Sequence, residues 1–178
     1  MRLISLKLVL SLLFAQSMLS AAHATPPPLR CADLIISADR AGKDIADHSD
    51  RRVVRVDGET LANPDALTAA VNRQGVEATI IVGGNFHGWD FSGLSLGLGC
   101  FVDSDLSQSN WSQARLSAPA FVRTNLEASN FQGANIAHVY FDNSNLKEVN
   151  ARDANLSWGR FGGGWFEGSV EGWIIDGA

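Results

Sequence analysis

The sequence predicts an all-β solenoid, a β-helix of about four coils with a small α+β cap at its amino-terminal end. The first observation is an apolar residue at every fifth position from Phe91 to Phe166, large at all of these positions except Ala151. The second is that a small residue stands two places before most of these positions, and Asn or Asp stands one place before. Neither an amphipathic helix nor a half-buried strand has a period of five, whereas a chain that turns a corner every five residues does.

Composition excludes several classes of protein. The chain has 178 residues, a net charge of −5 and a mean hydropathy of +0.01. A nucleic-acid-binding surface needs clustered positive charge, so we expect no nucleic-acid partner. Because no apolar run reaches the roughly 18 residues of a membrane-spanning helix, the sequence excludes a multi-pass membrane protein. Two cysteines are too few for a disulfide-stapled miniprotein.

Residues 1–24 have the features of a cleaved secretory signal peptide. Arg2 and Lys7 lie in a charged start, residues 8–19 are mostly apolar, and Ala22 and Ala24 flank the expected cleavage point after Ala24. An apolar centre of this length is too short to span a bilayer as a helix. We therefore expect a secreted or periplasmic protein with no integral membrane segment once the leader is removed.

Residues 25–78 are predicted to form a linker and the amino-terminal cap. The Thr-Pro-Pro-Pro start favours an extended spacer, and residues 34–36 and 53–56 have the composition of short strands. Asn63 followed by Pro and Asp is typical of a helix start, and Gly75 is predicted to end that helix. A stacked solenoid exposes apolar ends, so a cap is expected here.

The two cysteines, Cys31 and Cys100, are predicted to form a disulfide. Export would place them in an oxidising compartment, where a lone pair of cysteines is commonly joined. The bond would tie the cap to the early coils. The alternative is two free buried thiols, and no Cys-x-x-Cys sequence indicates redox activity.

Residues 79–168 carry the repeat, and the apolar residue of each repeat is predicted to lie in the core. The predicted structural core consists of Phe91, Leu96, Phe101, Leu106, Trp111, Leu116, Phe121, Leu126, Phe131, Ile136, Phe141, Leu146, Leu156, Phe161 and Phe166. Ala151 takes the same place in one repeat. The preceding Asn or Asp suits a turn because its side chain can bond nearby backbone.

The repeat resembles that of the pentapeptide-repeat family, whose consensus is A-(D/N)-L-x-x. The matching stretches begin at Thr124, Ser129, Ala134, Ser144 and Ala154, each followed by Asn and a large apolar residue. The resemblance implies the fold of that family, a right-handed quadrilateral β-helix with four pentapeptides in each coil.

The order of aromatic and aliphatic core residues supports four sides. With four pentapeptides per coil, residues 20 apart stack on one another. One ladder would then hold Phe101, Phe121 and Phe141, and the ladder across the core would hold Phe91, Trp111 and Phe131. Small residues two places earlier leave the space that the rings need.

Residues 169–178 form a carboxy-terminal tail in which the repeat stops. Trp173, Ile174 and Ile175 either fold over the last coil as a cap or mark a truncated chain. The absence of a polar capping helix favours truncation.

The sequence offers little support for an active site, and no catalytic, cofactor-binding or metal-binding residues are assigned. Asp44 and His48 lie four residues apart, and His87 is a further titratable group, but no third group completes a catalytic arrangement. A metal site needs three or four ligands at suitable spacing, and none is found. We therefore expect a protein that is not an enzyme and has no cofactor.

The preferred interpretation is an exported, non-enzymatic scaffold that binds another protein through an outer face of the solenoid. Trp158 or Trp165 would anchor such a contact if exposed, although we expect both to pack on the final coil.

Because some pentapeptide-repeat proteins inhibit DNA gyrase by resembling duplex DNA, the resemblance offers DNA mimicry as an alternative. Residues 89–168, however, contain eight acidic and five basic residues. This small excess of negative charge does not suit a duplex mimic. An accessory to an extracytoplasmic enzyme is a further alternative. The partner and the oligomeric state are not specified by the sequence.

Overall fold

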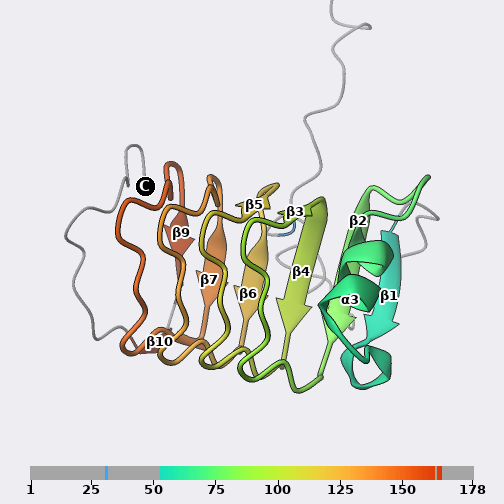
Figure 1. The fold of residues 1–178 in the computed structure, drawn as a ribbon, viewed down its shortest axis with the longest axis horizontal. Helices are drawn as coiled ribbons and strands as arrows, with labels where there is room; N and C mark the ends of the chain where they lie inside the picture. The colour runs from blue at the N-terminus through green and yellow to red at the C-terminus, as the bar shows by residue number, and fades with distance from the viewer. Residues whose placement is uncertain (1–30, 32–52, 163, 166–178) are drawn as a thin grey trace, which may run out of the picture.

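The computed structural model describes residue 31, residues 53–162 and residues 164–165 of the chain. Its main feature is a six-stranded parallel sheet in the order β1-β2-β4-β6-β7-β9 (Figure 1). The strands are β1 (Val53–Asp57), β2 (Ala78–Val82), β4 (Leu98–Val102), β6 (Ala120–Val122), β7 (Tyr140–Asp142) and β9 (Arg160–Phe161). The leader and the tail predicted for residues 1–24 and 169–178, and much of the 25–78 segment, lie outside the described residues.

Consecutive coils stack with an offset of 20 residues. Phe101 pairs with Phe121, and Phe121 with Phe141, across the main sheet. Two small parallel sheets repeat the offset on other sides of the coil, β3 (Ser95–Leu96) with β5 (Arg115–Leu116) and β8 (Ser144–Asn145) with β10 (Gly164–Trp165). The chain is therefore a β-solenoid of about four turns, and the predicted fold class is confirmed.

The amino-terminal end of the stack is built from β1, the short 3-10 helix η1 (Gly58–Thr60) and helix α3 (Pro64–Val71). The helix begins as predicted, because the Asn63 side chain accepts a hydrogen bond from the Ala66 N–H. Leu67 and Val71 are buried against the interior of the first coils. No helix in the described part of the chain is long and apolar enough to cross a membrane.

The helix ends earlier than predicted. Its last residue is Val71, four residues before the predicted stop at Gly75, and Asn72 takes the C-cap position. The Asn72 side chain accepts from the Gly97 N–H at 2.7 Å and donates to the Ser95 carbonyl at 2.8 Å. Because these two bonds hold Asn72 against the first coil, the chain does not continue as a helix beyond it. Gly75, with φ of 81°, serves the turn that follows.

Nearly every corner of the described coils places one residue in the left-handed region of backbone conformation. This residue stands two places after the core position, except after Leu96, where Leu98 begins β4; the side-chain-bearing residues are Asp103, Gln108, Gln113, Ala118, Arg123, Ala128, His138, Asn143, Glu148, Asp153 and Trp158. Glycine takes the same place at Gly83, Gly88, Gly93 and Gly133. The corner geometry therefore recurs at five-residue intervals, although most of the residues with a positive φ are not glycine.

Two aromatic ladders fill the core, as the sequence predicts. Phe101 and Phe121 stack with ring centroids 5.4 Å apart, and Trp111 and Phe131 stack at 5.8 Å. The ladders also meet edge to face, since Trp111 and Phe121 cross at 79°. The indole N–H of Trp111 donates to the Ser109 hydroxyl at 2.7 Å, so the one polar group of this ring is satisfied.

The predicted core is wrong at its carboxy-terminal end. Phe161 stacks on Phe141 but remains 47% exposed, because no described coil covers its outer side. Phe166, the last predicted core residue, lies outside the described residues. The other predicted core residues, from Phe91 to Leu156, are buried.

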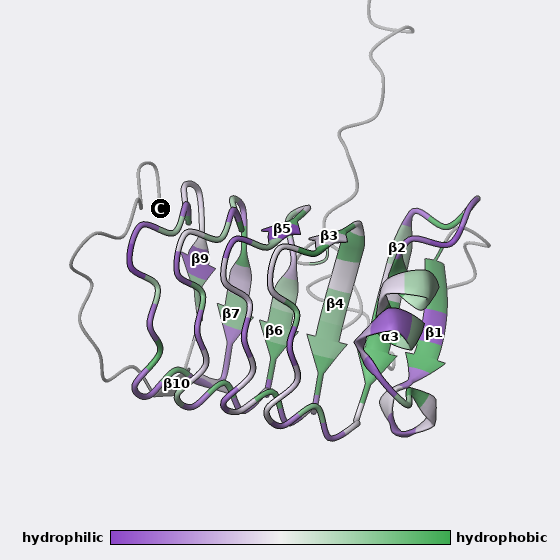
Figure 2. Cartoon of the chain, viewed as in Figure 1, coloured by the Kyte–Doolittle hydropathy of each residue, from purple (hydrophilic) through white to green (hydrophobic). Residues whose placement is uncertain are grey.

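A second apolar cluster lies on the face of the main sheet that points away from the aromatic core. It comprises Cys31, Ala78, Ile80, Leu98, Cys100, Val102, Ala120 and Val122, and all of them are buried. The sulfurs of Cys31 and Cys100 are bonded, with the Cα atoms 5.6 Å apart. Figure 2 shows that apolar residues dominate β2, β4 and β6, whereas hydrophilic residues appear toward β9.

Candidate interaction surface

Asparagine and aspartate ladders run along the sides of the solenoid other than the main sheet. Most of these side chains accept from a backbone N–H two residues later, at 3.0 to 3.2 Å. Asparagine Nδ2 also donates to the equivalent residue one coil earlier at 2.9 to 3.2 Å, as in Asn110 to Asp90, Asn125 to Asp105, Asn130 to Asn110, Asn145 to Asn125, Asn150 to Asn130 and Asn155 to Asn135. These amides are largely engaged within the fold, which leaves them few hydrogen bonds to offer a partner.

Asp90 begins one of these ladders, and its surroundings favour the carboxylate. The Ser92 backbone N–H, the Ser92 side chain and the Asn110 amide lower the pKa of Asp90 from its ordinary value, against a smaller opposing effect of burial. The charge is therefore satisfied by the turn and by the next coil.

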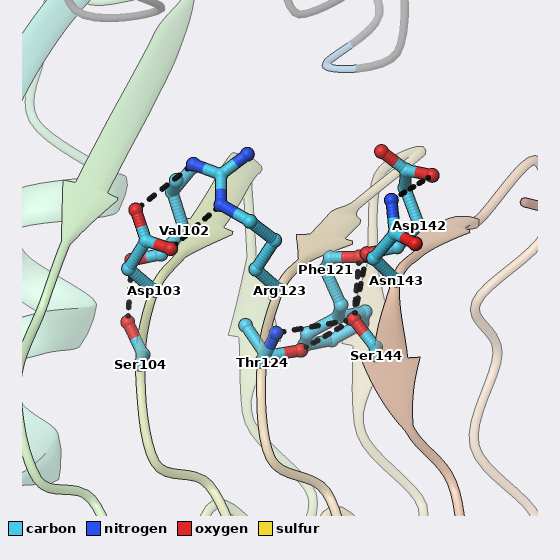
Figure 3. A network of polar contacts seen from close by, with 9 residues as sticks. All are labelled: Val102, Asp103, Ser104, Phe121, Arg123, Thr124, Asp142, Asn143 and Ser144. Carbon is cyan, nitrogen blue, oxygen red and sulfur yellow. Dashed lines mark hydrogen bonds and ion pairs between the residues drawn. The ribbon is translucent and has the colours of Figure 1, made fainter. Parts of the chain in front are cut away.

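Charged residues along the described coils are partly paired. Arg123 makes two hydrogen bonds to the Asp103 carboxylate, at 2.7 and 2.9 Å, across neighbouring coils (Figure 3). Lys147 lies 3.9 Å from Glu127 and 3.8 Å from Glu148. Since cations interrupt the carboxylates, the described coils do not carry the continuous acidic stripe that would suit a duplex mimic.

The predicted titratable residues do not form a catalytic arrangement among the described residues. His87 Nδ1 lies 2.9 Å from the Ser107 hydroxyl, and that hydroxyl lies 2.6 Å from an Asp105 carboxylate oxygen. A catalytic carboxylate would orient the imidazole, whereas Asp105 accepts a hydrogen bond from the serine hydroxyl itself. Asp44 and His48 lie outside the described residues. Within the part that the structure describes, no three His, Cys, Asp or Glu residues are grouped to hold a metal ion.

Trp158 is the most conspicuous side chain on the surface. It occupies the corner after Leu156, with φ of 62°, and is 61% exposed. The expectation that Trp158 packs on the final coil is therefore wrong, because the corner directs this side chain outward. The side chain of Trp165, in β10, lies outside the described part.

The surroundings of Trp158 combine aromatic and cationic groups. The His138 ring, one coil earlier, lies nearly parallel to the indole, with the centroids 6.4 Å apart. Arg160 and Phe161 follow Trp158 closely and are both exposed. Among the described carboxylates, none lies within 4.0 Å of the Arg160 guanidinium. We call Trp158, His138, Arg160 and Phe161 the terminal patch. The pattern that reveals it in the sequence is a large aromatic residue at a corner position.

Comparison with known proteins identifies the repeat. A family model described as pentapeptide repeats matches residues 121–163 with eight copies. No curated protein matches the sequence.

Three solved structures of similar proteins were compared. QnrB1, a plasmid-mediated fluoroquinolone resistance protein, is 14% identical over 60% of this chain and 57% of its own, with a TM-score of 0.35. A pentapeptide-repeat protein of the Arabidopsis thaliana thylakoid lumen is 21% identical over 51% and 61%, with a TM-score of 0.29. HetL, a pentapeptide-repeat protein involved in heterocyst differentiation regulation in a Nostoc cyanobacterium, is 18% identical over 46% and 36%, with a TM-score of 0.28. The chain thus matches less than two thirds of the length of each.

Proposed function

Because this chain carries pentapeptide repeats, we propose that it is an exported, non-enzymatic scaffold that binds another protein through the terminal patch. The leader-like residues 1–24 support export to the periplasm or the exterior. The Cys31–Cys100 disulfide also supports it, because such bonds persist in oxidising compartments.

The exposure of Trp158 in a left-handed corner carries the proposal. A residue other than glycine costs roughly 1–2 kcal/mol in this conformation. An indole that is 61% exposed recovers little of that cost by burial. Since neither the backbone nor the core explains a tryptophan here, its role lies in an external contact, where exposed tryptophan often dominates binding energy.

The chemistry of the described surface supports a binding role over catalysis. The amide ladders satisfy one another, and the Ser107 hydroxyl is committed to Asp105. A serine nucleophile of the triad type donates its one hydrogen to an imidazole, whereas the Ser107 hydroxyl donates it to Asp105 and therefore cannot also donate to His87.

Site-specific photocrosslinking tests the proposal. A photoreactive phenylalanine analogue replaces Trp158 in the full-length protein, which is irradiated in its producing cells, and the products are identified by mass spectrometry. Gln113 is the matched control, because it is also an exposed left-handed corner residue but lies on another side of the coil. We expect one partner to be captured from position 158 and not from position 113.

Two outcomes would contradict the proposal. Equal capture from both positions would show that the terminal patch has no special role. Mass spectrometry of the same protein tests export, because a mature chain that still begins at Met1 would contradict cleavage after Ala24.

A further inference from the structure

We propose that the outer face of the main sheet, over β2, β4 and β6, is a docking site for residues 32–52 of this same chain. The outer face is the side that points away from the aromatic core and carries the second apolar cluster. The Cys31–Cys100 disulfide holds the start of the segment at the centre of this face. The inference goes beyond the proposed function, because it concerns another side of the solenoid and removes that side from the surface open to a partner.

The outer face is built from alternate residues of the main-sheet strands. In β4, Phe101 lies in the aromatic core, whereas its neighbours Cys100 and Val102 belong to the second apolar cluster. Successive side chains of a strand point to opposite sides of a sheet, so this cluster lies outside the solenoid. The strand register places Ala120 beside Cys100 and Val122 beside Val102. The apolar surface therefore continues from one coil to the next.

The outer face is buried, which means that part of the chain covers it. Ile80, Cys100, Ala120 and Val122 are each at most 1% exposed. Among the buried members of the cluster, Cys31 is the one that lies outside the sheet. Because neighbouring strands are about 4.8 Å apart, β2, β4 and β6 together are about 10 Å wide, more than one cysteine side chain covers. This burial occurs within a single chain, so further residues of the same chain complete the cover.

The extent of the cover follows from one row of residues across the sheet. Arg55 in β1, Cys100 in β4, Tyr140 in β7 and Arg160 in β9 lie in this row. Cys100 is fully buried and Tyr140 is partly buried, whereas the two arginines are exposed. Burial is therefore greatest where Cys31 is bonded to Cys100, and it falls toward both ends of the row.

Residues 32–52 are joined to this sheet at both ends. The segment follows Cys31, which is bonded to β4, and it leads into Val53, the first residue of β1. Since β2 separates β1 from β4, these two strands are about 10 Å apart. A segment of this length can span about 70 Å when extended. Its surplus length is enough for it to pass over β4 and β6 before it reaches β1.

The start of the segment has the composition that an apolar face requires. Leu34, Ile35 and Ile36 follow Cys31 closely, whereas residues 37–52 are mostly polar or charged. Cys31 has a helical backbone conformation, and residues three and four places apart share one side of a helix. At that spacing Leu34 and Ile35 would meet the outer face beside Cys31. The sides left to a partner are the amide ladders and the corners, including that of Trp158.

Photocrosslinking within the purified protein, with its disulfide intact, tests the inference. A photoreactive phenylalanine analogue replaces Tyr140, which packs against the second apolar cluster, and crosslinked peptides are identified by mass spectrometry after proteolysis. Gln132 is the control position, because it is exposed on another side of the coil. Isotope-labelled and unlabelled protein are mixed in equal amounts, so that a crosslink between two copies carries both isotopes.

We expect position 140 to crosslink to residues 32–52 of the same copy, and position 132 not to do so. Leu34→Asp should reduce the yield from position 140 severalfold, because it places a charge against an apolar surface. Ala46→Asp adds the same charge to the polar part of the segment and should leave the yield unchanged.

Several results would overturn the inference. A crosslink from position 140 that carries both isotopes would identify a second copy as the cover, and one to residues 1–30 or 166–178 would identify another part of the chain. Equal capture of residues 32–52 from positions 140 and 132, equal effects of the two substitutions, or no crosslink from position 140 would also contradict it. The crosslinking at position 158 decides the proposed function separately.

Discussion

Two equivalent serines in neighbouring coils should respond in opposite ways to the loss of their hydroxyl groups. Ser109 and Ser129 are 20 residues apart, and both side chains are fully buried beside the core. The Ser109 hydroxyl donates to the Leu106 carbonyl at 2.6 Å and accepts from the Trp111 indole at 2.7 Å. The Ser129 hydroxyl has no hydrogen-bond partner, and the residue that stands in the place of Trp111 is Phe131, which has no donor.

The magnitudes follow from this difference. A buried polar group without a partner costs about 1–3 kcal/mol, so Ser129→Ala removes that cost and leaves only a small void. We expect it to raise the free energy of unfolding by about 1 kcal/mol. Ser109→Ala leaves the Trp111 indole N–H unsatisfied and should lower it by about 1–3 kcal/mol.

Urea unfolding and thermal melts of both variants measure these effects. A change of 1 kcal/mol shifts Tm by about 2–4 °C in a domain of about 150–250 residues, so the two variants should still be separated. An unchanged urea m-value would show that the change lies in stability and not in the compactness of the unfolded state. If Ser129→Ala destabilises the protein as much as Ser109→Ala does, the assignment of the orphaned hydroxyl is wrong.

Other parts of the fold give further measurable expectations. Phe121→Ala removes the middle of an aromatic ladder and should cost about 3–5 kcal/mol in urea unfolding, so a loss below about 1 kcal/mol would contradict the stacking. Replacing Cys31 and Cys100 together by serine removes a cross-link between residues 69 apart and should lower the free energy of unfolding by about 4 kcal/mol. An unchanged Tm after reduction of the wild-type disulfide would contradict this. The lowered pKa of Asp90 means that its contribution is present above the unfolded value of 3.8 and is lost as pH falls through the folded pKa. The Tm of Asp90→Asn should therefore approach that of the wild type as the pH falls below 3.8, and a constant difference would refute this.

The buried positions of the coils could be predicted because each depends on a short local pattern. A corner after every fifth residue sends Phe101, Phe121 and Phe141 inward and stacks them. The turn role of asparagine could be predicted too, since an Asn side chain accepts from backbone two residues later. The hydrogen bond between equivalent asparagines of neighbouring coils depends on the distance between the coils, and a five-residue sequence pattern does not specify that distance.

The candidate site was only partly predictable. The sequence drew attention to Trp158 but favoured a buried role, because tryptophan is usually buried to a large degree. A sign of exposure was available, since Trp158 stands two places after Leu156, where the preceding coils carry mainly polar or small residues. The apolar outer side of the main sheet also had a signal in Val102 and Val122, which stand where other sides carry polar residues.

The sequence by itself determined the five-residue corner and the inward set of side chains, because steric fit and turn chemistry act within a few residues. Only the tertiary structure decided which equivalent side chains are covered by a neighbouring described coil. Phe141 and Phe161 occupy the same place in the repeat, yet one is buried and the other is half exposed. The physical reason is that burial in a solenoid comes from the neighbouring coil, so identical local patterns have different surroundings in the middle and at the end.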